Sequence, residues 1–326
     1  MEYDEYRAMN TSIQVAAEGS RADVEPGFRR VRRLVAASEA RFSRFLDDSE
    51  LCQLNRAAGR WFNASAELFD VLQKALALHE LSGGLFDPSI LKALQQAGYD
   101  RSIDIIRASG LPPVFPIFPP ADSRLNQVCL DPDRRAIYLP AEVQIDLGGI
   151  AKGWIAEKAT QLLAEYTPAC AVSAGGDMAF HGVPVGEPSW QVSLEDPWDE
   201  QSVLAILQAR SGGPATSSVT RRRWLQGSQV RHHIIDPRTS APAEVEWLSV
   251  SVGAPKATTA EAFTKAILIG GSHVGTQLAG KIPGLWFITV NPDGSLCGTQ
   301  ESKEIVYEPV DFQPVSPTRA ESSHFV

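Results

Sequence analysis

The sequence predicts an α+β fold, with antiparallel or mixed sheets and helices packed against them, and three observations support this. Apolar side chains recur with helical spacing in three segments, and short alternating runs typical of strands lie between these segments. Strand runs and helices do not alternate regularly, as a βαβ architecture would require. A length of 326 residues, 44% of them hydrophobic, suffices for one large domain or two closely packed ones.

Three helices are predicted from these apolar stripes. Residues 27–46 carry apolar side chains on one helical face, and residues 65–81 do the same before the glycine pair at 83–84 ends the pattern. The third stripe covers residues 259–270. The segment PPVFPIFPP, at 112–120, lacks too many backbone N–H groups to form a helix or a central strand, so we expect a rigid connector there.

Alternating or continuous apolar runs predict the strands. These runs are AIYLP at 136–140, AEVQIDL at 141–147, QVSLE at 191–195, EWLSVSVGA at 246–254 and GLWFITV at 284–290. Residues 9–308 are then expected to fold as one domain or as two intimately packed subdomains. Residues 1–8 are expected to form an N-terminal extension, and the Ser- and Pro-rich residues 309–326 a disordered tail.

Charge and cysteine content narrow the function classes. A formal net charge of −9 argues against a general nucleic-acid binder, which needs a basic surface to displace counterions. Three adjacent arginines at 221–223 are expected to lie on a solvated edge. The start of the sequence, MEYDEYRAMN, has no signal-peptide pattern, and no segment is apolar enough for membrane insertion. Four cysteines without paired spacing favour a cytoplasmic protein over a disulfide-bonded or zinc-bound one.

The segment VQIDLGGIAKGWIAEKA, at 143–159, places an acid, three glycines and a lysine between an apolar run and a helical stripe. We name residues 146–153 the glycine elbow. Glycines let a ligand approach the main chain closely, and a helix N-terminus presents free N–H groups and the positive end of a dipole to a phosphate. The pattern is neither G-x-G-x-x-G nor a Walker loop. A plain strand-to-helix turn with a surface lysine also explains it.

Three further loops combine glycine or histidine with aspartate at the ends of apolar runs. They are GGLFDPS at 83–89, SAGGDMAF at 173–180 and HHIIDPRTS at 232–240. Together with the glycine elbow they are typical of the polar rim of one pocket. For Asp177 and Asp236 a structural role is favoured, in which each carboxylate holds its own turn by hydrogen bonds to the backbone.

In this order and at this spacing, five motifs resemble the ApbE family of FAD:protein FMN transferases. They are GGLFDPS, DLGGIAKG, AGGD, HHIIDPRT and AEAFTKA, and the resemblance extends over about residues 9–306. It implies an enzyme that binds FAD, usually with magnesium, and transfers its FMN part to a threonine hydroxyl of an acceptor flavoprotein, releasing AMP. The family's acceptor motif is similar to Asp-Gly-x-[Ser/Thr]-Gly-Ala-[Ser/Thr], which this chain itself lacks.

The resemblance also implies site residues. His233 corresponds to the catalytic histidine, a residue type suited to accepting a proton near neutral pH, and His232 would point to the other face of an extended segment. Gly149 and Glu261 correspond to metal ligands, and Asn10 replaces a glycine while still tolerating a left-handed backbone. The implied cofactor-binding positions are Met9, Phe45, Ala97, Gly98, Tyr99, Asp146, Lys152, Ile235 and Lys265.

The motif AEAFTKA departs from the family pattern A-D-A-x-x-T-A, in which the Asp and the Thr ligate magnesium. Here Glu261 replaces the Asp and Lys265 replaces the Thr, and a lysine has no acceptor atom and repels a cation. One interpretation is local: Thr258 and Glu261 form a capping box, and Glu261 and Lys265 form an ion pair along the helix. The other, which we prefer, is that the Lys265 ammonium replaces the charge of the metal, so that a magnesium requirement is doubtful.

Two alternatives to the transferase retain the same pocket. Attack by water in place of threonine would make the protein an FAD pyrophosphatase that releases FMN and AMP. Loss of catalysis would leave an FAD-binding protein that stores or delivers the intact dinucleotide.

Overall fold

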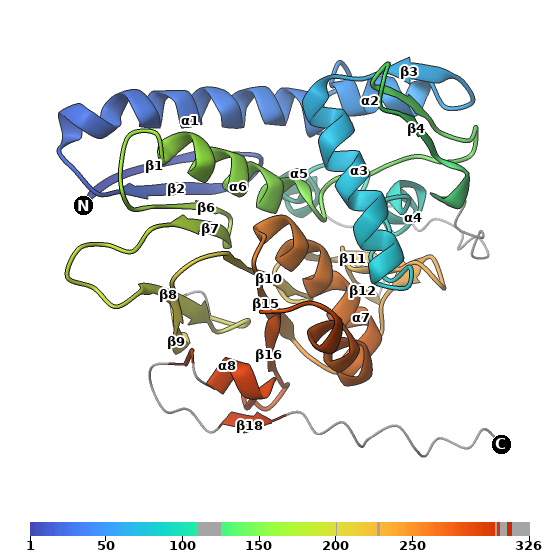
Figure 1. The fold of residues 1–326 in the computed structure, drawn as a ribbon. Helices are drawn as coiled ribbons and strands as arrows, with labels where there is room; N and C mark the ends of the chain where they lie inside the picture. The colour runs from blue at the N-terminus through green and yellow to red at the C-terminus, as the bar shows by residue number, and fades with distance from the viewer. Residues whose placement is uncertain (110–124, 200, 227–228, 304, 307–311, 315–326) are drawn as a thin grey trace.

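The computed structural model describes residues 1–109, 125–199, 201–226, 229–303, 305–306 and 312–314 (Figure 1). Helices and mostly antiparallel strands are both present in this part of the chain, so the α+β prediction is confirmed. The predicted connector at 112–120 lies outside the described residues. The helices are α1 (Arg21–Phe42), α2 (Glu50–Arg56), α3 (Ala66–Leu81), α4 (Leu91–Gln96), α5 (Ile103–Ser109), α6 (Ala151–Leu163), α7 (Ala257–Lys281), α8 (Gln300–Lys303) and a 3₁₀ turn at Leu125–Gln127.

The strands form two larger sheets and several small ones. The first sheet has the order β1-β2-β6-β7 and consists of β1 (Glu2–Ala8), β2 (Thr11–Ala17), β6 (Cys170–Ala174) and β7 (Asp177–His181). The second sheet has the order β10-β15-β16-β17-β18 and consists of β10 (Gly213–Ser218), β15 (Ser249–Ala254), β16 (Trp286–Val290), β17 (Leu296–Gly298) and β18 (Phe312–Pro314). The small sheets consist of β3 (Trp61–Asn63), β5 (Ala136–Tyr138) and β4 (Cys129–Asp131), and of the pairs β8 (Trp190–Glu195) with β9 (Val203–Ala209), β11 (Arg223–Gln226) with β12 (Gln229–His232), and β13 (Ile235–Asp236) with β14 (Ala241–Pro242).

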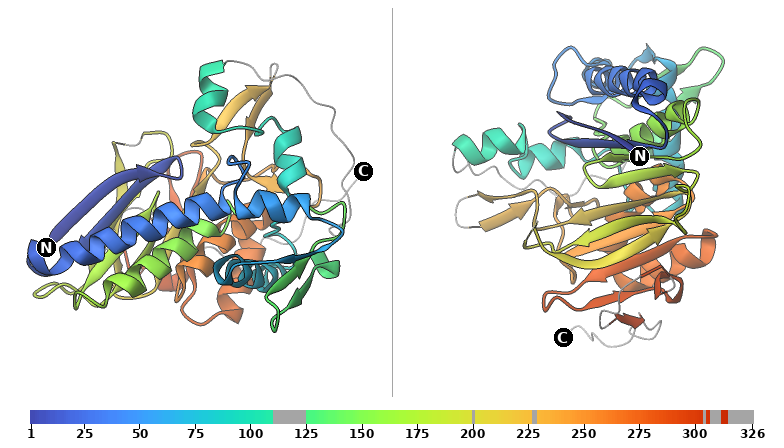
Figure 2. Two further views of the ribbon diagram at one scale, coloured as in Figure 1. Left: turned by 90° about the horizontal axis from the view of Figure 1, so that it is seen from above. Right: turned by 90° about the vertical axis from the view of Figure 1, so that its left-hand side faces the viewer.

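Helix α6 is central to the packing. It contacts α1 on one side, α7 on another, and strands β6 and β7 of the first sheet. Figure 2 shows α1 and α6 running alongside each other above that sheet. Trp154, Ile155, Ala159 and Leu163 of α6 are buried in the main hydrophobic core, as the helical spacing of these apolar residues predicts. The beginning of α6, which carries the glycine elbow, is therefore held in place by the core of the molecule.

A second, smaller core joins α4 and α5 to the hairpin β11–β12. Leu94, Tyr99 and Ile106 pack in it with Trp224 and Ile235. Both views in Figure 2 place the hairpin beside these two short helices. Segments more than a hundred residues apart in the chain are thus brought together on one side of the molecule.

The segment preceding the glycine elbow is not a strand, and this part of the prediction is wrong. Ile145 has its backbone N–H bonded to Asn55 Oδ1 at 2.7 Å, while Asn55 Nδ2 donates to the Ile145 carbonyl at 2.9 Å. Asp146 donates its N–H to the Pro88 carbonyl at 2.7 Å. A side-chain amide and a loop carbonyl therefore satisfy the backbone groups that a neighbouring strand would otherwise pair.

The ends of the chain also differ from expectation. Residues 1–8, predicted as an extension, contribute β1, which pairs along its whole length with β2. Within the predicted tail, residues 312–314 form β18, parallel to β17. Helix α1 begins at Arg21, earlier than predicted, because Ser20 caps it by accepting the N–H of Asp23 and the helix continues across Pro26.

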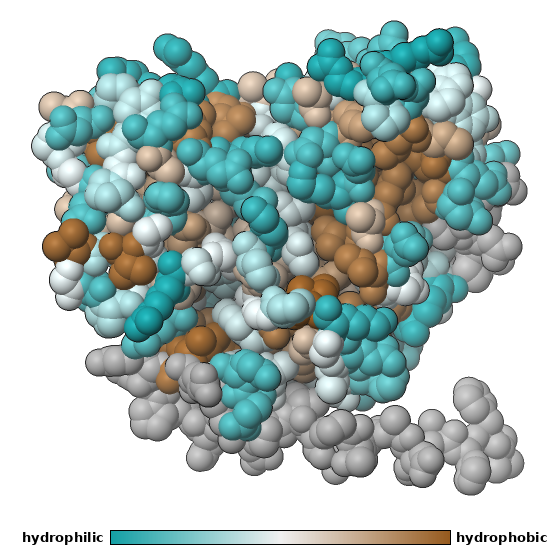
Figure 3. Space-filling model, in the orientation of Figure 1, coloured by the Kyte–Doolittle hydropathy of each residue, from teal (hydrophilic) through white to brown (hydrophobic). Residues whose placement is uncertain are grey.

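The surface in Figure 3 is hydrophilic along its upper edge, and its hydrophobic residues gather around α3, interrupted by hydrophilic ones. Such interruption is ordinary for a surface in contact with water. Within the described ranges, no helix combines the length and the apolar content that a membrane span needs.

Replacing Gly153 with alanine is expected to lower the free energy of unfolding by about 1–3 kcal/mol. A Cβ there would lie 2.5 Å from the carbonyl oxygen of Ala257, so α6 and α7 would have to separate. Gly280 is the matched control, because a Cβ on this helical residue meets no atom within 4 Å, and its replacement by alanine should raise stability by up to about 1 kcal/mol. Urea denaturation of both variants measures the difference, and equal losses would contradict it.

Candidate functional site

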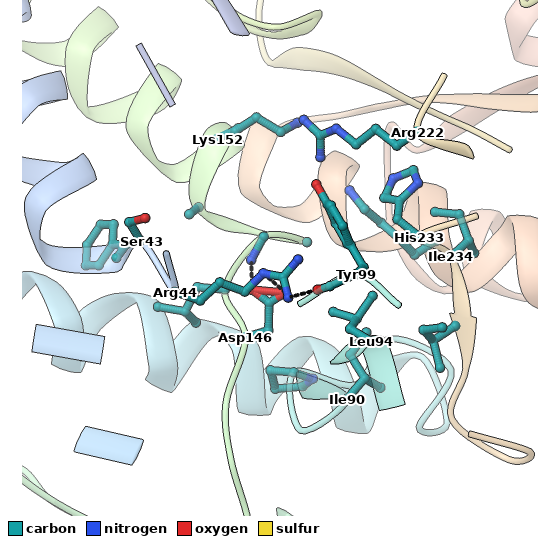
Figure 4. A pocket seen from close by; sticks show the side chains of 18 of the residues that line it. Ser43, Arg44, Ile90, Leu94, Tyr99, Asp146, Lys152, Arg222, His233 and Ile234 are labelled. Carbon is teal, nitrogen blue, oxygen red and sulfur yellow. Dashed lines mark hydrogen bonds and ion pairs between the residues drawn. The ribbon is translucent and has the colours of Figure 1, made fainter. Parts of the chain in front are cut away.

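A pocket opens where the glycine elbow, α7, the end of α1 and the small core meet (Figure 4). Its lining comes from segments scattered through most of the chain. The lining residues are Met9, Asn10, Ser38, Glu39, Phe42, Ser43, Arg44, Phe45, Leu85, Phe86, Asp87, Pro88, Ile90, Leu94, Tyr99, Ile103, Asp146, Leu147, Gly148, Gly149, Ala151, Lys152, Arg222, His233, Ile234, Ile235, Lys265 and Ile269. Three of the four predicted loops therefore meet in this pocket, whereas the fourth, at 173–180, contributes no lining residue.

Most of the residues predicted to bind the cofactor line this pocket. Ala97 and Gly98 do not: Ala97 is buried and its carbonyl accepts the indole N–H of Trp224 at 3.0 Å, and Gly98 turns the chain after α4 with a φ of 94°. Their role is to direct the chain toward Tyr99, which does line the pocket. Glu261 does not line it either, and lies behind Lys152 and Lys265.

The glycine elbow forms part of the pocket through close packing rather than through an unusual backbone. Neither Gly148 nor Gly149 has a positive φ. A Cβ at Gly149 would lie 3.1 Å from the Phe86 ring and face the Lys265 side chain at 3.8 Å. Asp146 closes the turn by accepting the N–H of Gly148 at 2.9 Å. The absence of side chains here leaves the main chain accessible beside Lys265.

Behind the elbow lies a buried cluster of charges, formed by two lysines and two carboxylates. The lysine pair, Lys152 and Lys265, places both Nζ atoms 3.3 Å from Oε1 of Glu261. The other oxygen, Oε2, accepts the Gly153 N–H at 2.8 Å. Lys152 also bonds to Asp177 Oδ2, and Asp177 Oδ1 is buried with no partner among the residues described. Glu261 and Asp177 are both 0% exposed, so the cluster depends on mutual compensation of charge.

Burial and the neighbouring charges determine the protonation of this cluster. Burial lowers the pKa of Lys152 to about 8, although the Glu261 carboxylate opposes the shift. Burial likewise lowers the pKa of Lys265. For Glu261, burial raises the pKa, but the two ammonium groups and the Gly153 N–H outweigh it, so the pKa is lowered overall and the carboxylate is ionised.

The two interpretations of AEAFTKA can now be compared with the contacts. The capping box is absent: Lys256 is the N-cap of α7 without a side-chain bond, and the Thr258 N–H is bound by Glu157 at 2.8 Å. The ion pair between Glu261 and Lys265 is present, at 3.3 Å. Yet Lys265 lines the pocket, so helix stabilisation and a role toward a ligand are compatible.

The donor set of this cluster does not fit a divalent cation. Magnesium requires about six oxygen ligands in octahedral geometry, whereas Glu261 is already bound by two ammonium groups and one N–H. A cation bound to this carboxylate would also face the positive charge of Lys265. Across the described residues, no group of three or more His, Cys, Asp or Glu side chains is arranged to hold a metal ion.

His233 is the neutral base of the pocket. Burial, the Arg222 guanidinium and the Lys265 ammonium hold the pKa of His233 well below its ordinary value of 6.5. Its Nδ1 is buried without a partner among the described atoms, so this nitrogen is uncommitted. His232 points elsewhere, as predicted, with Nε2 at 3.1 Å from the Ala243 carbonyl. Asp236 holds its own turn, as predicted, because Oδ1 accepts the Arg238 N–H at 2.9 Å. The same prediction is wrong for Asp177, whose Oδ2 accepts from Lys152 and whose Oδ1 has no partner among the described residues.

Aromatic side chains line the pocket beside His233, whose ring lies 6.5 Å from that of Tyr99. The Phe45 and Tyr99 rings meet edge to face at 6.0 Å, and Tyr99 stacks on Trp224 at 5.4 Å. Phe45 lies beyond the end of α1 at Phe42 and is 37% exposed. Both rings line the pocket, and Phe45 is the more exposed of the two.

Two arginines of the pocket were not anticipated as ligand-facing. Arg44 lies over the Phe45 and Tyr99 rings at 4.4 and 4.3 Å, donates to the Tyr99 carbonyl at 2.8 Å, and has Nε 3.8 Å from Asp146 Oδ2. Arg222 belongs to the run expected on a solvated edge, but it faces Lys152 across the pocket (Figure 4). Its position immediately before a hairpin that ends at His232 is the one sequence signal that could have identified it.

Comparisons with known proteins point to one family. A model of the ApbE family matches residues 9–288. The FAD:protein FMN transferase of Treponema pallidum is 28% identical over 309 residues, which cover 86% of this chain and 81% of that protein. That of Vibrio cholerae is 25% identical over 261 residues, covering 76% and 75%.

Solved structures show the same fold. The ApbE protein of Thermotoga maritima superposes with a TM-score of 0.80 at 24% identity, covering 94% of this chain and all of that one. The flavin transferase ApbE of Vibrio cholerae superposes with a TM-score of 0.75 at 22% identity, covering 93% and 98%. Since the family model spans the glycine elbow, His233 and the lysine pair, the chain belongs to the ApbE family.

Proposed function

We propose that this protein transfers the FMN part of FAD to a threonine hydroxyl of an acceptor flavoprotein, forming a phosphoester and releasing AMP. Two relatives, whose matches cover three quarters of the chain or more, are named FAD:protein FMN transferases. The observation that carries the proposal is that one pocket combines the aromatic side chains Phe45 and Tyr99 with the cations Lys152, Lys265 and Arg222. FAD has the matching division into a planar ring system and an anionic diphosphate.

These two groups of side chains suggest how FAD would lie. The isoalloxazine ring would contact Phe45 and Tyr99, with Ile90 and Leu94 on the apolar side, because flat rings gain most from stacking and edge contacts. The diphosphate would lie toward the lysine pair, where charge-assisted hydrogen bonds are strongest. This arrangement gives Met9, Asp146 and Ile235 supporting positions along the pocket.

His233 lies near enough to Arg222 and Lys265 for their charges to act on it, and it would take the proton of the acceptor. In the reaction, the threonine Oγ attacks the phosphorus of the FMN half, and the bond from that phosphorus to the bridging oxygen breaks. The threonine proton passes to the imidazole of His233, and AMP leaves with the bridging oxygen. A neutral imidazole is needed at the start, and the lowered pKa of His233 supplies it at neutral pH. Positive charge at the phosphates assists departure of AMP.

Two finer features complete the proposal. The acceptor carries a segment of the type Ser/Thr-Gly-Ala-Ser/Thr, as the resemblance to the ApbE family implies, and its hydroxyl must reach His233. The cytoplasm is the proposed location, because all four cysteines are free thiols, as expected in a reducing compartment.

The proposal is tested by mass spectrometry of a peptide containing Asp-Gly-x-Thr-Gly-Ala-Thr after incubation with the protein and FAD. An added mass of one FMN on a threonine, with AMP produced in equal amount, is the expected result. A peptide in which both threonines are replaced by valine is the control and should remain unmodified. AMP formed without any modified peptide would identify an FAD pyrophosphatase instead, and tight binding of FAD that stays intact would identify a carrier.

A further inference from the structure

The carboxylate of Glu261 is fully committed to groups of the protein. It is 0% exposed, Oε2 accepts the Gly153 N–H at 2.8 Å, and Oε1 lies 3.3 Å from Nζ of both Lys152 and Lys265. Lys265 additionally donates to the Glu261 carbonyl at 2.9 Å. A metal ion could bind this carboxylate only by displacing an ammonium group from it.

The charges of the cluster already balance. Lys152 and Lys265 carry two positive charges, and Glu261 and Asp177 carry two negative ones. Asp146 and Arg222, which also line the pocket and act on Lys265, add one charge of each sign. The pocket therefore has no surplus negative charge at this end, and negative charge is what attracts a divalent cation. An anion is the ligand that this balance favours.

We infer that the lysine pair, rather than a bound divalent cation, neutralises the diphosphate of the dinucleotide in this protein. This inference rests on the proposed function, because it takes FAD as the ligand. Each ammonium has three N–H groups. Glu261 engages the lysine pair from the buried side, and both side chains also line the pocket. Their remaining N–H groups can donate to phosphate oxygens.

Glu261 acts in this arrangement as a positioning residue. Two long side chains from different helices, α6 and α7, would otherwise have to be ordered when the ligand binds, at a cost in side-chain entropy. Their shared oxygen and the Gly153 N–H fix α6 and α7 relative to each other. Gly149 has no side chain, and this leaves space beside Lys265 for the ligand.

The first experiment measures the affinity of the wild-type protein for FAD by flavin fluorescence, once with EDTA and once with magnesium. We expect the two dissociation constants to agree within roughly twofold, because a metal that takes no part in binding leaves the affinity unchanged. Binding that requires magnesium would overturn the inference while leaving the transferase intact. Binding with EDTA but no modified peptide would support the inference and overturn the transferase. No FAD binding in either buffer would overturn both.

The second experiment uses Lys265→Met, which removes the charge and keeps an unbranched side chain. In EDTA the dissociation constant for FAD should rise about tenfold or more. The affinity for riboflavin, which has no phosphate, should stay the same. Lys281→Met is the matched control, because Lys281 is an exposed lysine at the end of the same helix, and it should bind FAD as the wild type does. An equal loss of affinity for FAD and riboflavin in a folded Lys265→Met protein would contradict the inference.

Discussion

Replacing His233 with alanine is expected to lower the rate of FMN transfer about 10²- to 10⁴-fold, the usual contribution of a general base. The dissociation constant for FAD should change little, because Tyr99 and the lysine pair remain in the pocket. The loss arises because no other described group near the proposed diphosphate position is a neutral base: Lys152, Lys265 and Arg222 are all cationic there. Initial rates of peptide modification and FAD titration measure the two quantities separately.

His232→Ala is the matched control for this prediction. His232 is the adjacent residue and the same residue type, but it does not line the pocket, and its ring contacts the Ala243 carbonyl. Its removal should cost about 1 kcal/mol of stability through the lost hydrogen bond and leave the transfer rate within a few fold. Similar losses of rate in both variants would show that the segment matters for folding and that His233 has no special role.

The pH dependence gives an independent check on the same residue. Because burial and neighbouring positive charges lower the pKa of His233 well below 6.5, the imidazole stays neutral as the pH falls through 6.5 and only then becomes protonated. The acid side of the profile of kcat/KM should therefore decline below pH 6.5 rather than at it. A profile that already falls to half its maximum near pH 7 would contradict the lowered pKa.

The pocket residues that could be predicted are those that lie in short, recognisable sequence motifs. The glycine elbow, His233 and Lys265 lie in short motifs whose order resembles one family, and all of them meet in one pocket. The α6 stripe was predictable from its own spacing, because one buried face fixes the period of apolar residues.

What could not be predicted depends on partners far away in the sequence. The run at 141–147 has a strand-like pattern, but Asn55, 90 residues earlier, binds the backbone of Ile145 and takes the place of a neighbouring strand. The predicted capping box does not form, because Glu157, 101 residues earlier, accepts the Thr258 N–H that Glu261 would accept in a capping box. In both cases a tertiary hydrogen bond competes with the local pattern, and the local pattern contains no information about it.

Arg44 and Arg222 illustrate the same limit for the site itself. A single arginine after a helix and a run of three before a hairpin look like surface charges. The directions of the two side chains are set by contacts that form only on folding. The Tyr99 carbonyl and ring orient Arg44, and the pairing of β11 with β12 positions Arg222.

Replacing Glu261 with glutamine is expected to lower the free energy of unfolding by about 3–5 kcal/mol, the cost of removing one partner from a buried ion pair. Glutamine keeps the size of the side chain and an oxygen for the Gly153 N–H. It leaves Lys152 and Lys265 beside each other without the carboxylate that both contact at 3.3 Å. Asp177 still pairs with Lys152, and the Asp146 carboxylate still attracts Lys265, so the compensation is partial. Urea denaturation monitored by tryptophan fluorescence measures the loss.

Two controls accompany this variant. Glu80→Gln removes an exposed carboxylate at the end of α3 and should change stability by less than about 0.5 kcal/mol. The double variant Glu261→Gln/Lys265→Met removes one charge of each sign from the cluster. It should recover part of the stability lost in Glu261→Gln, because the uncompensated ammonium is gone. A double variant whose loss equals the sum of the two single losses would show that the charges do not interact.

The sign of the pH effect distinguishes charge repulsion from lost packing. The pKa of Lys152 is about 8 in the folded protein and 10.5 for an ordinary lysine. Above about pH 8 the unfolded chain therefore binds more protons than the folded one, and the free energy of unfolding rises with pH through this window. Without Glu261, which raises the pKa of both lysines, they lose their protons at still lower pH. The cost of Glu261→Gln should consequently be largest near pH 6 and smaller near pH 9, whereas a packing defect would cost the same at both.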